Sequence, residues 1–324
     1  MNPALEQVEI GPLDQIRSLR RLFGIQTGIS SAPLAALAAH AITVRIPAGT
    51  ELHSPEEPVR DVYLIIEGEI AAQYGSAYRA YGPQSAIGVL ASIARVNNGF
   101  HSWALRDTLA LSLRVEDMLE VYEDHFELMY AALRSLSRDG IELRKQMKPH
   151  AGFSNVVPVG VVCPTRPLDL VERILALRHT FGLGHSHVDE LAELARSSNE
   201  VRYPAGTSLW TVDAPAETML LVICGSIRGS TRDGLSFQLG AGDIVGGLGM
   251  VAELPRWFSA TVQEPVVALS MEREVLIDLL EDQPELAFDF LQLMATALIA
   301  LREQAAVESM QTSPQASAEL AGTV

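Results

Sequence analysis

Residues 44–70 read VRIPAGTELHSPEEPVRDVYLIIEGEI, and residues 201–227 read VRYPAGTSLWTVDAPAETMLLVICGSI. The two stretches align without a gap at a constant offset of 157, and each carries Pro-Ala-Gly-Thr near its start and a glycine two residues before its end. Beyond that glycine the offset becomes 158, and it holds until Glu123-Asp124 meets Glu281-Asp282. Register kept over so long a stretch indicates a duplicated domain.

Each copy predicts a small antiparallel β-roll or jelly roll. Short runs of Val, Ile and Leu alternate with Gly and Pro turns about every 8–12 residues, a spacing typical of all-β domains. Pro47 presets φ for a tight turn, and Gly68 and Gly225 are expected where one strand reverses into the next and φ is positive. The predicted fold class is α+β, mainly β, with two such rolls flanked by helices.

Helices are expected before each roll at residues 33–40 and 187–196, and after each roll at residues 115–147 and 272–308. The later pair shows apolar residues at helical spacing. In the last helix one apolar stripe consists of Leu286, Phe290, Leu293, Met294, Ala297 and Leu301. We expect this stripe to pack on its own roll. A second interpretation, left open, is that the C-terminal helix also pairs with its copy in a homodimer.

The repeat and the composition of its flanks predict the domain organisation. Residues 1–16 form an N-terminal tail, 17–147 the first domain and 168–308 the second. Residues 148–167, rich in Pro, Gly and small residues, are a predicted linker. Residues 309–324 are polar and rich in Ala and Ser, and are predicted to be a disordered tail.

Charge and composition exclude several classes of partner. The 324 residues include 24 Lys plus Arg against 40 Asp plus Glu, a formal net charge of −16. So acidic a surface repels nucleic acid and anionic membranes, and neither is expected as a partner. We find no secretory signal and no run of about 18 apolar residues, which predicts a cytoplasmic protein. Cys163 and Cys224 are expected to be free thiols, with a disulfide between them as the alternative.

The order of motifs resembles the cyclic nucleotide-binding domain family. PAGT is followed by YLIIEGEI, by a glycine-containing segment before a strand, and by a long helix, over roughly residues 20–147 and 170–308. The resemblance implies a β-roll that carries a short phosphate-binding helix, and a C-terminal helix that shifts when ligand binds. In that family a glutamate after a glycine binds the ribose hydroxyl, and an arginine about ten residues later binds the cyclic phosphate.

The second copy of the family's cassette is residues 246–262, GGLGMVAELPRWFSATV. Gly247 stands where the family has its glutamate. Counting back from Ser259 puts Phe258 at the arginine position, whereas counting forward from Gly246 puts Arg256 there. The predicted ligand-binding residues of this copy are Gly246, Gly247, Leu248, Arg256, Ser259 and Thr261.

The first copy, residues 88–104, departs further from the family. Val89 replaces the glutamate, and Phe100 or Asn98 replaces the arginine. Its cassette residues, predicted to be non-functional, are Gly88, Val89, Leu90 and Ser102. Each lost anchor contributes roughly 1.5–3 kcal/mol, so losing two weakens binding by about 10²–10⁴-fold. We therefore expect no cofactor, and weak, altered or lost binding of cAMP or cGMP, with Arg256 as the one residue able to retain it.

The predicted function is that of a non-enzymatic regulatory protein that signals to a protein partner. The first alternative is an interaction scaffold with empty pockets, docking through its acidic surface or C-terminal helix. The second is a metal-dependent β-barrel enzyme built on His179, His185, His187, Asp189 and Glu190. We interpret that cluster instead as a helix start capped by Ser186 and Asp189. A DNA-binding output domain is not expected, because only about 20 residues follow Arg302 and a helix-turn-helix needs roughly 60.

Overall fold

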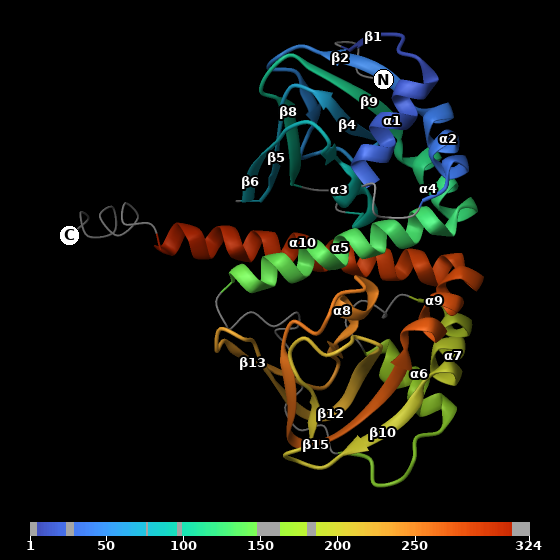
Figure 1. The fold of residues 1–324 in the computed structure, drawn as a ribbon, viewed down its shortest axis with the longest axis vertical. Coiled ribbons are helices and arrows are strands. Elements are labelled where there is room, and N and C mark those ends of the chain that lie inside the picture. Colours follow the sequence, from blue (N-terminus) through green and yellow to red (C-terminus); the bar gives the residue numbers. More distant parts are fainter. Residues whose placement is uncertain are drawn as a thin grey trace, which may run out of the picture. The chain divides into compact units, whose positions relative to one another are not determined.

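The computed structural model describes residues 5–23, 29–75, 77–95, 99–147, 163–179 and 186–312. Its contacts divide the chain into two compact units (Figure 1): Met1–Ala132 with Leu298–Val324, and Leu133–Ala297. Each unit is built around one β-roll. The boundaries predicted from the sequence, 17–147 and 168–308, follow the repeat and stay a prediction, because the units reflect packing rather than sequence similarity.

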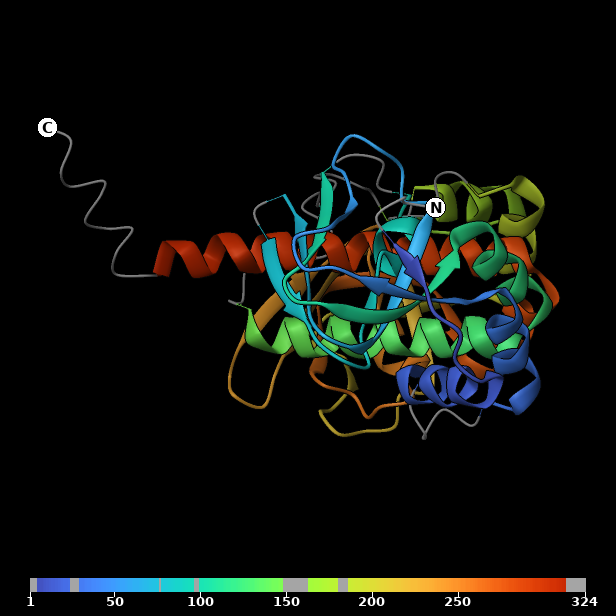
Figure 2. The ribbon, with the colours of Figure 1, turned by 90° about the horizontal axis from the view of Figure 1, so that it is seen from above.

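The roll of unit 1 consists of two antiparallel sheets. Its strands are β1 (Glu6–Gln7), β2 (Ile42–Ile46), β3 (Glu51–His53), β4 (Asp61–Glu67), β5 (Ile70–Tyr74), β6 (Ala77–Tyr81), β7 (Ala86–Ile87), β8 (Phe100–Ala104) and β9 (Thr108–Arg114). One sheet has the order β1-β2-β9-β4-β7 and the other β3-β8-β5-β6. Figure 2 shows the whole ribbon from above, with the strands of this roll in blue to green.

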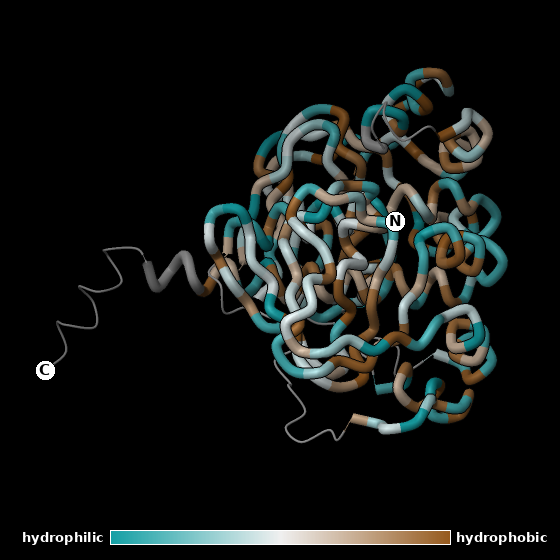
Figure 3. Tube along the Cα trace, turned by 60° about the horizontal axis from the view of Figure 1, so that its bottom comes forward, coloured by the Kyte–Doolittle hydropathy of each residue, from teal (hydrophilic) through white to brown (hydrophobic). Residues whose placement is uncertain are grey.

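The roll of unit 2 repeats this pattern with fewer, longer strands. They are β10 (Asn199–Tyr203), β11 (Ser208–Trp210), β12 (Thr218–Ser230), β13 (Ser236–Leu239), β14 (Ile244–Val245) and β15 (Ser259–Glu272). The sheet order is β10-β15-β12-β13, with β11 on β15 and β14 on β12. Hydrophobic and hydrophilic stretches are interspersed along the trace in Figure 3. The prediction of two β-rolls is confirmed.

Helices flank both rolls, as predicted. Unit 1 has α1 (Pro12–Phe23), α2 (Ser31–His40), α3 (Val89–Ile93) and α4 (Val115–Asp124), while unit 2 has α6 (Leu170–Arg178), α7 (Val188–Ser197), α8 (Gly247–Val251) and α9 (Arg273–Asp282). Two long helices, α5 (Phe126–Gln146) and α10 (Pro284–Thr312), have residues in both units. α1 packs on α2, and α6 packs on α7.

The single helix predicted after each roll is broken into two. The breaks fall at His125 and Gln283, which are equivalent in the repeat and share nearly the same backbone angles, with φ near −130° and ψ near 84°. Gln283 precedes Pro284, and a residue before proline is disfavoured in the helical region. No proline follows His125, so only the repeat itself could have indicated that break.

Gly68 and Gly225 have positive φ, 95° and 85°, as predicted, but they do not both sit at a strand reversal. β12 runs continuously through Gly225, and the register of its pairing with β15 shifts there. An added Cβ at Gly225 would collide with the carbonyl oxygen of Pro265. Gly225 therefore marks a β-bulge at which a neighbouring backbone approaches closely, which only glycine allows.

Cys163 and Cys224 form a disulfide, so the prediction of two free thiols is wrong. Their Cα atoms lie 5.3 Å apart, within the range that a disulfide needs. Cys224 lies in β12 and is fully buried. The spacing of 61 residues in the sequence could not show this pairing, because it depends on how residues 163–168 fold back over β12.

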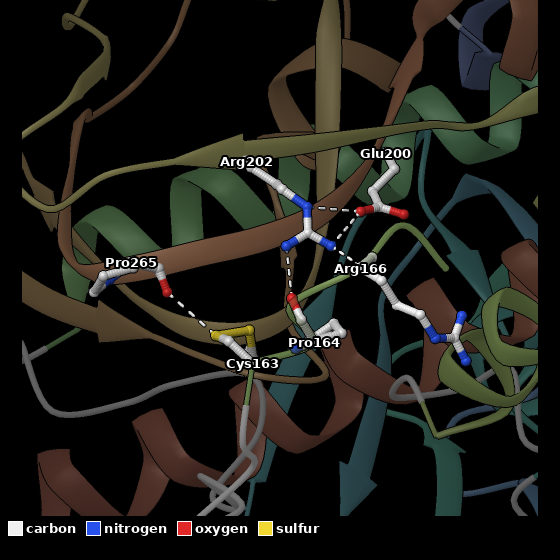
Figure 4. The surroundings of a disulfide bond; sticks show 7 residues. Cys163, Pro164, Arg166, Glu200, Arg202 and Pro265 are labelled. Carbon is white, nitrogen blue, oxygen red and sulfur yellow. Dashed lines mark hydrogen bonds and ion pairs between the residues drawn. A yellow bond between two sulfur atoms is a disulfide. The ribbon is translucent and has the colours of Figure 1, made fainter. Parts of the chain in front are cut away.

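Polar contacts hold the segment 163–168 on the same roll (Figure 4). Arg202 donates one hydrogen bond to the carbonyl of Pro164 and one to that of Arg166, both at 2.6 Å. The carboxylate of Glu200 accepts from the backbone N–H of Leu168 at 2.7 Å and pairs with Arg202 at 2.7 Å. The disulfide and this clamp together fix the segment to β10 and β12.

The sequence was expected to contain no segment apolar enough to span a membrane, and α10 is an exception to this expectation. Among the described residues, its part Pro284–Val307 is long and apolar enough to do so by length and composition, with mean hydropathy 1.4. However, 56% of the apolar window is buried inside the structure, and core helices of other folds pass the same test. The apolar stripe predicted for this helix is buried at Leu286, Phe290, Leu293, Ala297 and Leu301.

Candidate ligand-binding cassettes

A short helix opens the cassette in each roll, at equivalent places. α8 begins after Gly246 and α3 after Gly88, and both glycines are left-handed, with φ of 84° and 91°. In the second roll an added Cβ at Gly246 would collide with the guanidinium of Arg256. The cassette frame implied by the resemblance is therefore present in both units, and in the second it is packed around an arginine.

Arg256 points into its own roll. Its Nη1 donates to the carbonyl of Gly246 at 3.1 Å, and its Nη2 donates to the carbonyl of Thr218 at 2.6 Å and to the Thr218 hydroxyl at 3.2 Å. The guanidinium carbon lies 4.0 Å from the centre of the Trp210 ring, and the residue is 3% exposed. Burial lowers the pKa of Arg256 to about 10, opposed by the charge of Glu217, so the side chain stays cationic.

In the first roll, a histidine is hydrogen-bonded to the equivalent backbone carbonyl. His53 is the counterpart of Trp210 at the offset of 157, and Asp61 is the counterpart of Thr218. The Nε2–H of His53 donates to the carbonyl of Asp61 at 2.7 Å, so its Nδ1 accepts from the hydroxyl of Ser102 at 2.6 Å. The carbonyls of Asp61 and Thr218 are equivalent in the repeat. The first accepts a hydrogen bond from His53 and the second from Arg256.

The first-roll arrangement predicts a pH dependence of stability. Burial lowers the pKa of His53 below its ordinary value, although the hydrogen bond to the Asp61 carbonyl and the charge of Asp61 oppose the shift. The unfolded chain therefore binds a proton at this histidine first as the pH falls. The stabilisation is complete above about pH 6.5 and is lost as the pH falls toward the lower, folded-state value.

The measurement is thermal unfolding at about pH 7.5 and about pH 5, in the natural chain and in His53→Gln, whose amide N–H still reaches a carbonyl. We expect the natural chain to lose more stability on acidification than the variant. Equal losses would show that His53 does not titrate between these pH values.

Aromatic side chains fill the interior of both rolls. Phe258, which is 3% exposed, lies with its ring centre 4.8 Å from that of Trp257, 5.1 Å from Phe237 and 5.8 Å from Trp210. Its counterpart Phe100 is equally buried and contacts Tyr74 at 4.5 Å and His53 at 5.1 Å. Phenylalanine is therefore a core residue at the position that counting back assigned to the arginine.

The other predicted cassette residues make local contacts. The Ser259 hydroxyl accepts from the N–H of Val212 at 2.9 Å, and Thr261 pairs with Ser208 across the sheet. Gly247 is buried, while Leu248, Val89 and Leu90 are half-buried. Asn98 lies outside the described residues. His53 and Trp210 were not identified as site residues from the sequence. The two are equivalent in the repeat and both have ring side chains, which could have indicated their role.

An open hollow of about 520 Å³ lies elsewhere on the second roll. It is lined by Ser226, Arg228, Ser236, Phe237, Gln238, Gln263 and Glu264. None of the predicted cassette residues lines it. The predicted cassettes and this hollow are separate features.

The histidine cluster near residue 187 starts a helix. The N–H of His187 donates to the carboxylate of Glu190 at 2.9 Å, so the cap is His187 with Glu190 rather than Ser186 with Asp189. Ser186 donates instead to Asp289 of α10. His179 bonds the carbonyl of Leu175 at 2.6 Å, and His185 lies outside the described residues. Within the described ranges no group of three His, Cys, Asp or Glu side chains could hold a metal ion.

Comparison with known proteins adds to this geometry. Residues 200–283 match the family model for the cyclic nucleotide-binding domain. A CRP-like cAMP-activated global transcriptional regulator of Mycobacterium tuberculosis (strain ATCC 25618 / H37Rv) is 27% identical over 113 residues, 33% of this chain and 50% of the regulator. The chain thus spans about half the length of the curated relatives it matches.

Solved structures of low similarity accompany these matches. A structure of cAMP-bound PfPKA-R has 13% identity and a TM-score of 0.37, covering 86% of this chain and 87% of its own. A cyclic nucleotide-binding domain from Methylobacillus flagellatus KT has 21% identity and a TM-score of 0.39, covering 44% and 84%. The family match lies in the second copy, so residues 200–283 are similar to a cyclic nucleotide-binding domain, and the first copy has a β-roll with a cassette helix at the equivalent place.

Proposed function

We propose that the chain is a non-enzymatic regulatory protein that has lost ordinary cAMP and cGMP binding and signals through helix movement to a protein partner. One observation carries the proposal: Arg256 is hydrogen-bonded to the carbonyls of Gly246 and Thr218 within its own roll. To bind a phosphate it would have to leave them. The carbonyl of Thr218 would then lose its guanidinium donor, and an unsatisfied buried acceptor costs about 1–3 kcal/mol, which opposes ligand binding.

Two further features support the loss of binding. No acid stands at the ribose-binding position, which is occupied by Gly247 and Val89. The interior of each roll is filled by a phenylalanine, Phe258 or Phe100, that is 3% exposed. A nucleotide base entering the roll would have to displace these rings, and their burial stabilises the fold by roughly 1.5–3 kcal/mol each.

The test is thermal unfolding of the full chain with millimolar cAMP, cGMP or cyclic dinucleotides. We expect no shift with cAMP or cGMP, because a ligand at 100 times its Kd stabilises the fold by about 2.7 kcal/mol, which is readily measured. A shift with cAMP would contradict the proposal. Because a curated relative that the chain matches is cAMP-activated, this nucleotide is the first ligand to examine.

A matched pair of variants identifies the anchor if a shift is seen. Arg256→Ala should abolish it, whereas Arg228→Ala, which removes an exposed arginine of the same roll, should leave it unchanged. A shift that persists in Arg256→Ala would mean that the ligand is held elsewhere, for which the hollow beside Arg228 is the next place to look.

The scaffold alternative is supported by the formal net charge of −16, which suits a basic protein partner. It differs from the regulatory proposal in that the helices would not move. A homodimer through the C-terminal helix, a cytoplasmic location, and the absence of nucleic-acid and membrane partners stay predictions from the sequence.

A further inference from the structure

The second half of α5 packs with the roll of the other repeat. α5 follows the first roll in the sequence, but its residues from Leu133 onward belong to the compact unit Leu133–Ala297. The resemblance implied a C-terminal helix that shifts when ligand binds. Within unit 2, it is α5 that contacts the second cassette.

An ion pair joins α5 to the residue that follows the cassette helix. Arg134 Nη2 lies 3.2 Å from Glu253 Oε2, with the Arg134 side chain only 15% exposed and that of Glu253 38% exposed. Glu253 comes two residues after the end of α8 and has a left-handed φ of 54°. Because Glu253 follows α8 so closely, a displacement of α8 would move its carboxylate relative to Arg134.

A close contact lies one and a half turns farther along α5. An added Cβ at Gly140 would lie 3.8 and 3.9 Å from the two methyl carbons of Leu248, the second residue of α8. Glycine at this position costs helix stability of about 1 kcal/mol relative to alanine. Since an alanine would also fit at these distances, the spacing shows that α5 passes beside Leu248 at ordinary van der Waals contact.

A second arginine of α5 faces the loop before the cassette. Burial lowers the pKa of Arg144 to about 10, and the charge of Asp243 opposes this shift. Asp243 is 8% exposed, and its carboxylate accepts from the N–H of Gly240 at 2.7 Å, in the turn that leads to β14 and α8. Arg134 and Arg144 lie ten residues, or about three helical turns, apart along α5.

The end of α10 likewise has a contact in unit 1, although the Arg134–Glu253 ion pair has no counterpart there, because the equivalent residues are Gln292 and Arg95. At the offset of 158, Arg302 is the counterpart of Arg144. Arg302 belongs to unit 1, where its Nη1 lies 3.4 Å from the hydroxyl of Tyr81. Each compact unit therefore contains the end of the long helix that follows the other repeat's roll.

We propose that the second cassette acts on α5, the helix of the first repeat, through the Arg134–Glu253 ion pair. Arg134 is then a positioning residue, and a displacement of α8 changes the ordering of residues 133–146. The inference deepens the proposed signalling by helix movement and rests on it. It needs no bound nucleotide, because it concerns a contact present in the chain as it stands.

The test is amide hydrogen exchange of the full chain in Arg134→Glu, in Glu253→Arg and in the double variant that swaps the charges. Each single change should speed exchange in α8 and in residues 133–146 by about two- to fivefold, the size expected from an ion pair of this exposure. The double variant should return to within about twofold of the natural chain. Residues 284–297 of α10 should not change in any variant.

Lys145→Glu is the matched control, since it reverses an exposed charge on the same helix. An effect on α8 as large in Lys145→Glu as in Arg134→Glu, or no effect in the single variants, would overturn the inference. If Arg134→Glu does not fold, Glu253→Gln removes the charge at the more exposed partner and must show the same local change. A positive melting shift with cAMP would contradict the proposed loss of binding while leaving this result in force.

Discussion

Replacing Cys163 by Ser is expected to lower the free energy of unfolding of the second roll by about 2–4 kcal/mol. The disulfide joins residues 61 apart in sequence, and closing a loop of that size in the unfolded chain accounts for up to about 4 kcal/mol in the chain-entropy model. The melting temperature should fall by roughly 5–15 °C. Denaturant unfolding without reductant measures the difference directly.

Reduction of the natural chain by a dithiol is the complementary measurement, and it should reproduce the loss seen in Cys163→Ser. Arg202→Ala is the matched control, because it removes the hydrogen bonds to the carbonyls of Pro164 and Arg166 but leaves the disulfide. We expect it to cost less than Cys163→Ser. Two titratable thiols in the unreduced, unfolded chain, or equal stability of Cys163→Ser and the natural protein, would contradict the prediction.

The disulfide also bears on the predicted cytoplasmic location. Disulfides persist mainly in oxidising compartments, whereas cytosolic thiols are kept reduced. The counterpart of Cys224 in the first repeat is Glu67, which is exposed. Cys224 is buried and bonded to Cys163, so the first repeat has no counterpart of this disulfide.

The repeat made the fold predictable because strand alternation and glycine positions recur in register. Gly88 and Gly246 both have a left-handed backbone and stand directly before a cassette helix. Because glycine adopts this conformation most readily, the local sequence was enough to place both helices. Pro284 offered a similar local signal for the helix break at Gln283, which was not used. Features that depend only on the backbone and its neighbours are those the sequence expresses most directly.

The direction in which a side chain points was harder to predict from the sequence. The loop between α8 and β15 is two residues longer than the family pattern, so the sequence left Arg256 and Phe258 as rival arginine positions. The choice depends on packing against Trp210, which lies 46 residues away in the sequence. Likewise, the contact of Arg134 with Glu253 joins two repeats of the sequence, and no pattern within either repeat predicts it.

Arg256→Ala is expected to lower the free energy of unfolding by about 3 kcal/mol. The carbonyl of Thr218 loses its guanidinium donor, and an unsatisfied buried acceptor costs about 1–3 kcal/mol. The carbonyl of Gly246 still accepts from the N–H of Met250 at 3.3 Å, so it contributes less to the loss. The remainder comes from the guanidinium stacked on Trp210, which is worth about 2 kcal/mol when desolvated.

Arg228→Ala is the control for loss of an arginine from the same roll, and it should change stability by less than about 0.5 kcal/mol because the side chain is exposed. Chemical denaturation of both variants measures the contrast. A loss below about 1 kcal/mol in Arg256→Ala would mean that water satisfies the Thr218 carbonyl in its place.

The first roll provides a rescue design for the same site. Its His53 and Ser102 correspond to Trp210 and Ala260, so Trp210→His with Ala260→Ser rebuilds the pair that bonds the equivalent carbonyl in unit 1. Added to Arg256→Ala, these two changes should recover about 1 kcal/mol, the worth of a typical buried hydrogen bond. The rescued variant should also become less stable below about pH 6.5, because a neutral histidine now holds the carbonyl. Recovery without that pH dependence would mean that the histidine packs in the site without donating to the Thr218 carbonyl.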